Sequence, residues 1–159
     1  MSNISMLSFD EVQRTIEKAL RLLYKNDLFL ITNTTNERSI THKFAEYIQS
    51  LFPEWNVDCE YNRKGEGESK EIDGQKTSYP DIIVHLRNTK HNLLIIEAKK
   101  YPACHNEVKE DKAKIEKYIQ NQEYGYKFGL LVCFYKELEE TKMIWFKNKD
   151  GKCEQMETK

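Results

Sequence analysis

The chain has few of the residues that mark small secreted or membrane-spanning proteins. Its 159 residues include only four cysteines, three prolines and six glycines. No two cysteines form a CxxC pair, which argues against a zinc ribbon and, in a cytosolic protein, against a disulfide framework, so most should be unpaired thiols. The sequence has no run of 18 apolar residues, and "MSNISMLSFDEV" lacks the basic and apolar regions of a secretory signal. We therefore expect a cytoplasmic protein that does not enter the membrane.

An excess of charge of one sign is also absent. The 25 Lys and Arg residues balance 26 Asp and Glu residues, so the chain has no basic surplus of the kind typical of nucleic-acid-binding proteins. Apolar and aromatic residues make up 39% and 11% of the sequence, which excludes the composition of a disordered chain. The length suits a single domain over residues 1–159.

Hydrophobic spacing predicts two helices before the first strand. "SFDE" reads as a capping box at Ser8, and apolar residues at three- and four-residue spacing extend the first helix to about Tyr24. A second helix is predicted from Thr35 to Phe52, closed by Pro53. "WNVDCEYNR" alternates as a strand does, and the charged segment from Lys64 to Thr77 is expected to be a mobile loop.

The second half of the chain predicts strands around one further helix. "DIIVHLR" and "NLLIIEAKK" are separated only by "NTKHN", which favours an antiparallel hairpin. "NEVKEDKAKIEKYIQNQEYG" is amphipathic and predicts a helix ending near Gly125, followed by strands in "KFGLLVCFY" and "TKMIWF". Residues 148–159 are expected to fray. This order predicts a mixed α/β (α+β) fold with a core over about residues 36–147.

Each of the two apolar runs carries one carboxylate. A hairpin turn centred on Thr89 places Asp81 opposite Glu97, with Lys99 on the same face of the sheet. Opposed Cβ atoms lie about 5 Å apart, so the two carboxylates repel unless a cation lies between them. Magnesium suits this need, because it takes one or two protein carboxylates together with substrate phosphate. Lys99 would orient a water and stabilise charge developing on the phosphate.

The residues "PD" at 80–81 and "EAK" at 97–99 resemble the PD-(D/E)xK motif of the restriction-endonuclease-like nuclease superfamily. The order of elements from Asn36 to Tyr135 is similar to that superfamily's core, αβββαβ with a central mixed sheet flanked by helices, here preceded by an N-terminal helix. "NERSITHKFAEYI", "EYNR", "PDIIVH" and "NLLIIEAKK" are similar to segments of small uncharacterised bacterial members.

The resemblance implies an endonuclease or related phosphodiesterase that hydrolyses DNA with Mg²⁺ or Mn²⁺. Asp81 and Glu97 would bind the metal, and the Ala98 carbonyl would add a ligand. Lys99 would assist the attacking water. Glu37 matches a glutamate that family members often place on the helix before the first core strand.

Six side chains are candidate contacts to the substrate: Tyr61, Asn62, Arg63, His85, Lys114 and Tyr118. "EYNR" equally fits a strand edge and its exit, and a satisfied imidazole is the simpler interpretation of His85, although it shares the face of Asp81. The mixed charges from Glu107 to Lys117, Asp111 and Lys114 among them, are interpreted as a solvated helix face. A subset of these nucleases has a glutamine four residues before a tyrosine, whereas here Lys114 precedes Tyr118.

A non-catalytic module is the rival interpretation. Such a protein would keep the fold and bind nucleic acid or a partner protein, with a homodimer as another possibility. The near-neutral charge favours it, because affinity for DNA rests largely on neutralising phosphates. The complete set of two acids and a lysine favours the enzyme, because a module without chemistry has no reason to keep all three.

Overall fold

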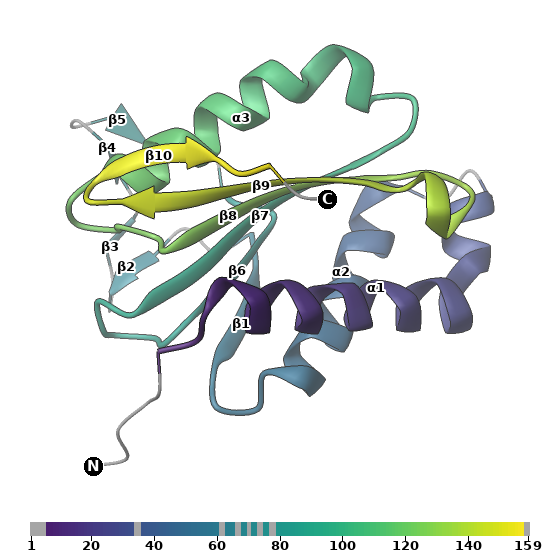
Figure 1. The fold of residues 1–159 in the computed structure, drawn as a ribbon, viewed down its shortest axis with the longest axis horizontal. Helices are drawn as coiled ribbons and strands as arrows, with labels where there is room; N and C mark the ends of the chain where they lie inside the picture. Colours follow the sequence, from purple (N-terminus) through teal and green to yellow (C-terminus); the bar gives the residue numbers. More distant parts are fainter. Residues whose placement is uncertain are drawn as a thin grey trace.

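A six-stranded mixed sheet forms the centre of the structure, a computed structural model (Figure 1). It describes residues 6–33, 36–60, 63–65, 68–69, 71–72, 75–76 and 79–157, without the side chains of 61–78 and 104–107. The strands lie in the order β1 (Asn56–Cys59), β6 (Ile82–His85), β7 (Asn92–Lys100), β8 (Phe128–Phe134), β9 (Lys142–Lys149) and β10 (Lys152–Gln155). Only β7 and β8 are parallel, and all other neighbours are antiparallel.

Helices cover both faces of this sheet. The chain forms α1 (Phe9–Thr32), α2 (Glu37–Leu51), α3 (Cys104–Gln120) and the 3₁₀ helix η1 (Leu138–Glu140). Figure 1 shows α1 and α2 on one side of the sheet and α3 on the other. None of the helices in the described ranges is long and apolar enough to cross a membrane. The parallel pair β7 and β8 is joined through α3, which crosses the face of the sheet between them.

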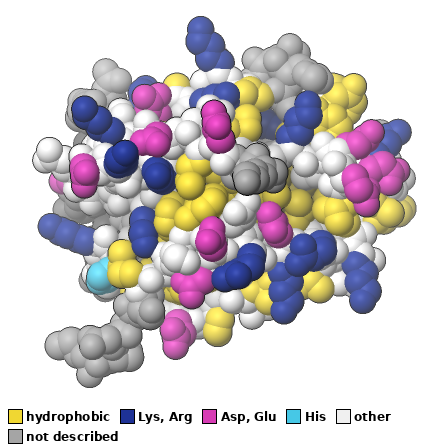
Figure 2. Space-filling model, viewed as in Figure 1, with side chains coloured by type: hydrophobic (Ala, Val, Ile, Leu, Met, Phe, Trp, Pro, Cys, Tyr) yellow, Lys and Arg dark blue, Asp and Glu magenta, His cyan; other side chains and the backbone are white. Residues whose placement is uncertain are grey.

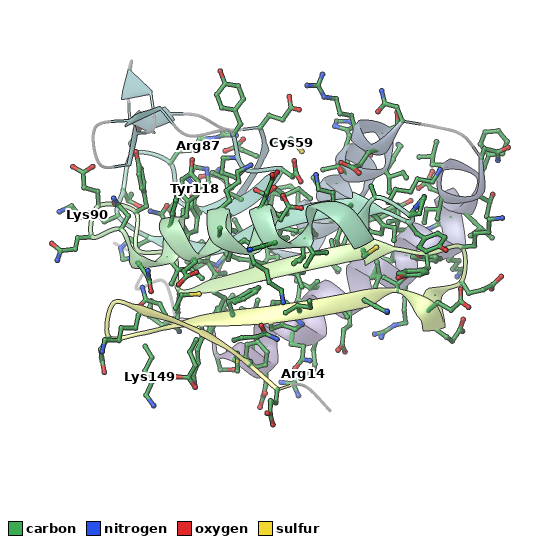
Figure 3. All side chains as sticks on the ribbon, turned by 90° about the horizontal axis from the view of Figure 1, so that it is seen from above. Arg14, Cys59, Arg87, Lys90, Tyr118 and Lys149 are labelled. Carbon is green, nitrogen blue, oxygen red and sulfur yellow. The ribbon has the colours of Figure 1, made fainter. Side chains whose placement is uncertain are left out.

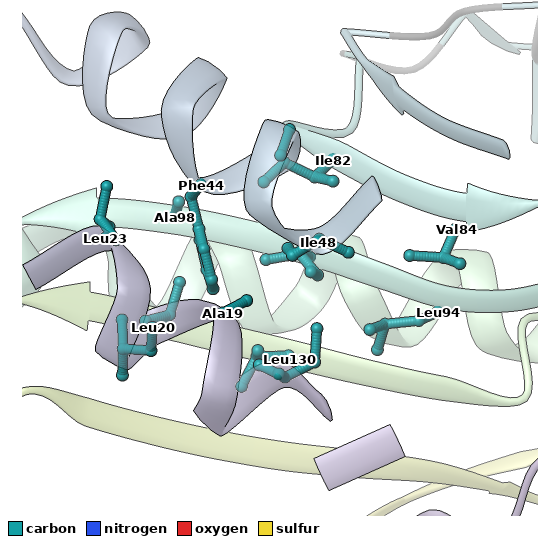
Figure 4. Close-up of a cluster of buried hydrophobic side chains, with 14 of the residues drawn as sticks. Ala19, Leu20, Leu23, Phe44, Ile48, Ile82, Val84, Leu94, Ala98 and Leu130 are labelled. Atoms are coloured by element: carbon teal, nitrogen blue, oxygen red, sulfur yellow. The ribbon is translucent and has the colours of Figure 1, made fainter. Parts of the chain in front are cut away.

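Alternate residues of the central strands point to opposite faces of the sheet and fill two hydrophobic cores. Even-numbered residues of β6 and β7 face α1 and α2, where Ile82, Leu94 and Ala98 are fully buried (Figure 4). Odd-numbered residues face α3, where Ile83 and Ile95 are equally buried. This continuous apolar run is what a strand covered on both faces requires, and it fixes which side chains can point toward each helix.

The first helix begins as predicted and runs further. Ser8 and Glu11 form both hydrogen bonds of the capping box. The predicted end at Tyr24 is wrong, because the helix resumes after a single non-helical residue, Asp27, and buries Ile31. The apolar spacing in the sequence stops near Tyr24 because the next position of the buried stripe is the non-helical Asp27, and the stripe resumes only at Ile31.

The predicted frayed end is wrong for residues 148–155. β9 continues to Lys149 and pairs with β10, with Lys149 opposite Lys152. Asp150 and Gly151 form the two-residue turn between them, with φ of 52° and 85°. Asp-Gly is a strong sequence indication of such a turn, because both positions need a positive φ.

Other boundaries also differ from the predictions. α3 ends at Gln120 rather than near Gly125, where the tyrosines of "EYGY" pack beneath the helix instead of extending it. Short strands in two pairs occur within the segment predicted as a loop: β2 (Arg63–Gly65) with β3 (Glu68–Ser69), and β4 (Glu71–Ile72) with β5 (Gln75–Lys76). Its predicted mobility concerns residues that lie largely outside the described ones. Cys133 is disulfide-bonded, whereas Cys59 and Cys153 are free thiols. The expectation of an unpaired thiol is therefore wrong for Cys133, because the spacing of cysteines in the sequence does not report which of them meet in space.

Close packing of β8 against α3 generates a test of the fold. A Cβ added at Gly129 would overlap Cγ2 of Ile115 and lie 3.0 Å from Cδ1 of Ile119. We expect Gly129→Ala to lower the free energy of unfolding by about 1–3 kcal/mol through overpacking. In a denaturant-unfolding cycle with Ile115→Ala, which removes the overlapping methyl, the double variant should be less destabilised than the two single changes added together. Strict additivity would contradict this packing.

Candidate functional site

The hairpin of β6 and β7 brings the two carboxylates of the motif to one end of the sheet. Ile82 pairs with Ile96, and Ile83 with Ile95, which confirms the register expected from a turn centred on Thr89. Continued by one residue, this register sets Asp81 opposite Glu97. The strand β6 is shorter than predicted, because the ladder shifts at His85 and the chain then turns.

Asp81 and Glu97 share the face of the sheet that α3 covers, because they continue the odd-numbered series of Ile83 and Ile95. Oδ2 of Asp81 accepts a hydrogen bond of 2.8 Å from the backbone N–H of Ala98. The side chain therefore occupies the position where a ladder partner would otherwise stand. Glu97 is almost completely buried, with 1% of its surface exposed.

Burial raises the pKa of Glu97 well above its ordinary value, and the neighbouring charge of Asp81 raises it further. The ammonium group of Lys114 opposes this shift, with Nζ 3.0 Å from Oε1 of Glu97. Among the described residues, Oε1 makes no hydrogen bond of good geometry, so this contact is an ion pair rather than a directed bond. Nζ of Lys114 donates a hydrogen bond of 2.5 Å to the backbone carbonyl of Tyr79.

Lys99 lies between two further carboxylates. Its Nζ is 3.7 Å from Oδ2 of Asp111 on α3 and 3.9 Å from Oε1 of Glu37 at the start of α2. Oε2 of Glu37 also accepts a 3.1 Å hydrogen bond from the backbone N–H of Lys100. Glu37, Asp81, Glu97 and Lys99, the four residues proposed for chemistry from the sequence, thus gather at one end of the sheet.

Asp111 is a member of this cluster that the sequence interpretation missed. Asp111 is 8% exposed and the Lys114 side chain 17% exposed, so their assignment to a solvated helix face is wrong. The relevant pattern was present: Asp111 lies three residues after Val108 and four before Ile115, on the apolar stripe of the helix. When the helix packs on the sheet, a carboxylate on such a stripe is buried, and this is costly unless a cation pairs with it.

The remaining candidates lie apart from the carboxylates or beneath the surface. His85 is buried and its Nε2 lies 2.7 Å from Oδ2 of Asp58, which also binds Arg87. Burial alone would raise the pKa of Asp58, but the hydrogen bonds from His85 and Arg87 hold it well below its ordinary value.

Tyr118 packs against Tyr124 with 1% of its surface exposed, and a substrate contact there stays a prediction. Figure 3 shows Tyr118 on α3. Tyr61, Asn62 and the side chain of Arg63 lie outside the described residues.

The carboxylate oxygens of Asp81 and Glu97 fit a hard divalent cation that takes only a few of its ligands from the protein. Carboxylate oxygens are the ligands that magnesium prefers, and one or two from the protein are sufficient when water and phosphate complete the shell. No group of three or more His, Cys, Asp or Glu side chains within the described part of the chain is arranged as a metal cage. The buried, poorly satisfied Oε1 of Glu97 is the atom that such a cation would satisfy.

The Ala98 carbonyl is also compatible with the role expected of it. The N–H and C=O of one strand residue point to the same neighbouring strand, so the Ala98 carbonyl points to the side of Asp81. The continued register sets Pro80 opposite Ala98, and proline has no N–H to donate to that carbonyl.

Comparison with known proteins assigns no family. No family model, no curated protein and no solved structure matches the chain.

The raised pKa of Glu97 predicts a specific pH dependence of stability. A carboxyl group whose pKa is raised by folding stabilises the protein fully below its unfolded pKa, and this contribution is lost as pH rises through the folded pKa. Glu97→Gln cannot ionise, so in EDTA its free energy of unfolding should rise relative to the wild type between pH 4 and 8, by about 1.4 kcal/mol for each unit of pKa shift.

Glu46→Gln is the matched control for this series of urea unfolding curves. Hydrogen bonding to Lys43 lowers the pKa of the exposed Glu46, so the sign of its pH trend is opposite to that of Glu97. If the free energies of unfolding of Glu97→Gln and the wild type differ by the same amount at every pH, Glu97 is not held in a costly ionised form.

Proposed function

We propose that this protein is a metal-dependent nuclease that hydrolyses phosphodiester bonds in DNA. One observation carries the proposal: the β6–β7 register that opposes Asp81 and Glu97, with Lys99 on the same face. Glu97 is buried where a carboxylate is costly, and a protein without chemistry has no use for a second carboxylate opposite it.

The charges of the cluster support a divalent cation. Four carboxylates, those of Glu37, Asp81, Glu97 and Asp111, gather with two ammonium groups, those of Lys99 and Lys114. When all are ionised, these described side chains together carry a formal charge of −2. The raised pKa of Glu97 has the direction expected of a buried carboxylate beside another carboxylate. A bound Mg²⁺ or Mn²⁺ would neutralise this charge.

The order of elements supports a restriction-endonuclease-like core. With the small strands β2 to β5 set aside, α2, β1, β6, β7, α3 and β8 follow the order αβββαβ. The sheet is mixed, its parallel pair is connected through a helix, and helices flank both faces. In this arrangement Glu97 and Lys99 lie on β7, and Asp81 lies directly before β6, where its side chain is held by the backbone N–H of Ala98.

The residues have separate roles in the proposed hydrolysis. A cation held by Asp81 and Glu97 would supply an activated water and charge stabilisation at the phosphate. Lys99 orients the attacking water and donates to the phosphate oxygens as negative charge develops there. Glu37 and Asp111 position the Lys99 ammonium group. As water attacks phosphorus it releases one proton to solvent, the bond to the leaving oxygen breaks, and that oxygen takes up a proton from solvent.

A second candidate function is a catalytically silent module of the same fold. The 3.0 Å pair of Lys114 with Glu97 favours it, because an internal cation already occupies one side of the buried carboxylate. Figure 2 shows basic and acidic side chains interspersed over one face of the molecule, in agreement with the near-neutral net charge. A module of this kind would act through a partner protein or as a homodimer.

Cleavage assays on variants separate binding from catalysis. With Mg²⁺ and plasmid or single-stranded circular DNA, Lys99→Ala should lower the cleavage rate about 100- to 1,000-fold through loss of one charge-stabilising group. Calorimetry should find its Mg²⁺ affinity largely unchanged. Asp81→Ala should lose both activity and affinity, because it deletes a ligand.

Lys117→Ala serves as the matched control, because Lys117 lies on the exposed side of α3. Wild-type cleavage by the Lys99→Ala protein would refute the role of Lys99. Equal cleavage by Asp81→Ala as well would reveal a contaminating nuclease and leave the silent module as the better account.

A further inference from the structure

A row of side chains beside Lys99 forms a second recognition surface on the α3 face of the sheet. Lys99 of β7 pairs with the disulfide-bonded Cys133 of β8, and Cys133 pairs with Lys142 of β9. The two lysines therefore flank β8 in one line across the sheet, about 10 Å apart at the backbone. Both reach the same cavity.

This cavity has a volume of about 170 Å³ and mostly apolar walls. Val108 of α3, Leu131 of β8 and Ile144 of β9 line its floor and sides. Lys99, Tyr135 and Lys142 also line it. A space of this size suits a single flat ring, and the two ammonium groups suit an anion attached to that ring.

An aromatic pair continues the surface beyond the two lysines. The rings of Tyr101 and Tyr135 lie with centroids 4.7 Å apart and planes inclined by 30°. Nζ of Lys142 lies 5.5 Å from the Tyr135 ring centroid, within the range of a cation–π contact. Tyr101 is 46% exposed although it belongs to this stack, so a large part of an aromatic side chain faces solvent two residues after Lys99.

We propose that this surface, the pair Tyr101 and Tyr135 with Lys99 and Lys142, binds an unpaired stretch of a nucleic-acid strand. Bases stack on the tyrosines or enter the cavity, and backbone phosphates lie against the lysines. Paired bases in a duplex are covered by their neighbours and cannot reach the cavity. That the bound strand is a substrate rests on the proposed nuclease function, and the binding itself does not.

Alternating basic and aromatic groups separate this ligand from simpler anions. A free phosphate or an acidic peptide would use Lys99 and Lys142 but would leave the tyrosines without a role. A purely apolar ligand would make no use of the exposed Lys142 ammonium group beside the Tyr135 ring. A chain of nucleotides carries both components at regular spacing, and unpaired bases bring about 1–3 kcal/mol of stacking each.

The test is binding of a fluorescein-labelled 12-nucleotide oligothymidylate, followed by fluorescence anisotropy in EDTA so that hydrolysis cannot occur. The oligothymidylate should bind the wild-type protein about tenfold more tightly than a 12-base-pair duplex, although the duplex carries the phosphates of two strands. Tyr101→Ala should weaken binding about 5- to 150-fold, the equivalent of one lost stacking contact. Tyr101→Phe keeps the ring and should bind as the wild type does.

Lys142 has a matched control on the same strand. Lys142→Ala should weaken binding and reduce its dependence on salt, whereas Lys149→Ala, with the same charge change at the other end of β9 (Figure 3), should leave both unchanged. Equal affinity for duplex and single strand, or Tyr101→Ala binding like the wild type, would overturn the inference. Equal loss with Lys149→Ala would reveal general electrostatic attraction and would overturn it too.

The outcomes for binding and cleavage are independent. Tight single-strand binding that depends on Tyr101, with no cleavage in Mg²⁺ or Mn²⁺, would support this surface and refute the nuclease. Cleavage that depends on Lys99, with no effect of Tyr101→Ala on the KM or Kd of single strands, would support the nuclease and refute this surface.

Discussion

Pairing of β6 with β7 is the constraint on which the rest of the candidate site depends. Side chains alternate across a strand, so a register slip of one residue would separate Asp81 from Glu97 and send one of them toward α1 and α2. The apolar residues on both faces of these strands resist such a slip, because each has a core to fill. The same packing that stabilises the sheet therefore fixes two like charges against each other.

Burial of Glu97 then determines what surrounds it. An isolated carboxylate in this position is costly, so its pKa is raised, and the ammonium group of Lys114 from α3 opposes that shift. The charge of Lys99 is compensated in turn by Glu37, the first residue of α2, and by Asp111 of α3. The site is thus a set of charges drawn from α2, β7 and α3, and its geometry depends on how these helices dock on the sheet.

The sequence predicted those parts of the structure that depend on local periodicity. The capping box at Ser8, the hairpin register and the order of the main elements followed from spacing and turn position alone. Asp111 and Lys114 could not be assigned by charge counting, because their burial results from the docking of α3 and not from the charge pattern of the helix. The β9–β10 hairpin was missed although Asp150 and Gly151 encode its turn. The disulfide at Cys133 depends on tertiary proximity, which spacing does not contain.

The central claim is that Asp81 and Glu97 together hold a divalent cation. Crystals soaked in Mn²⁺ and measured for anomalous scattering test it most directly. The account predicts one strong anomalous peak about 2.0–2.3 Å from a carboxylate oxygen of each residue, with Lys114 moved away from Oε1 of Glu97. An anomalous map without a peak between the two carboxylates, with Lys114 still paired to Glu97, would contradict it.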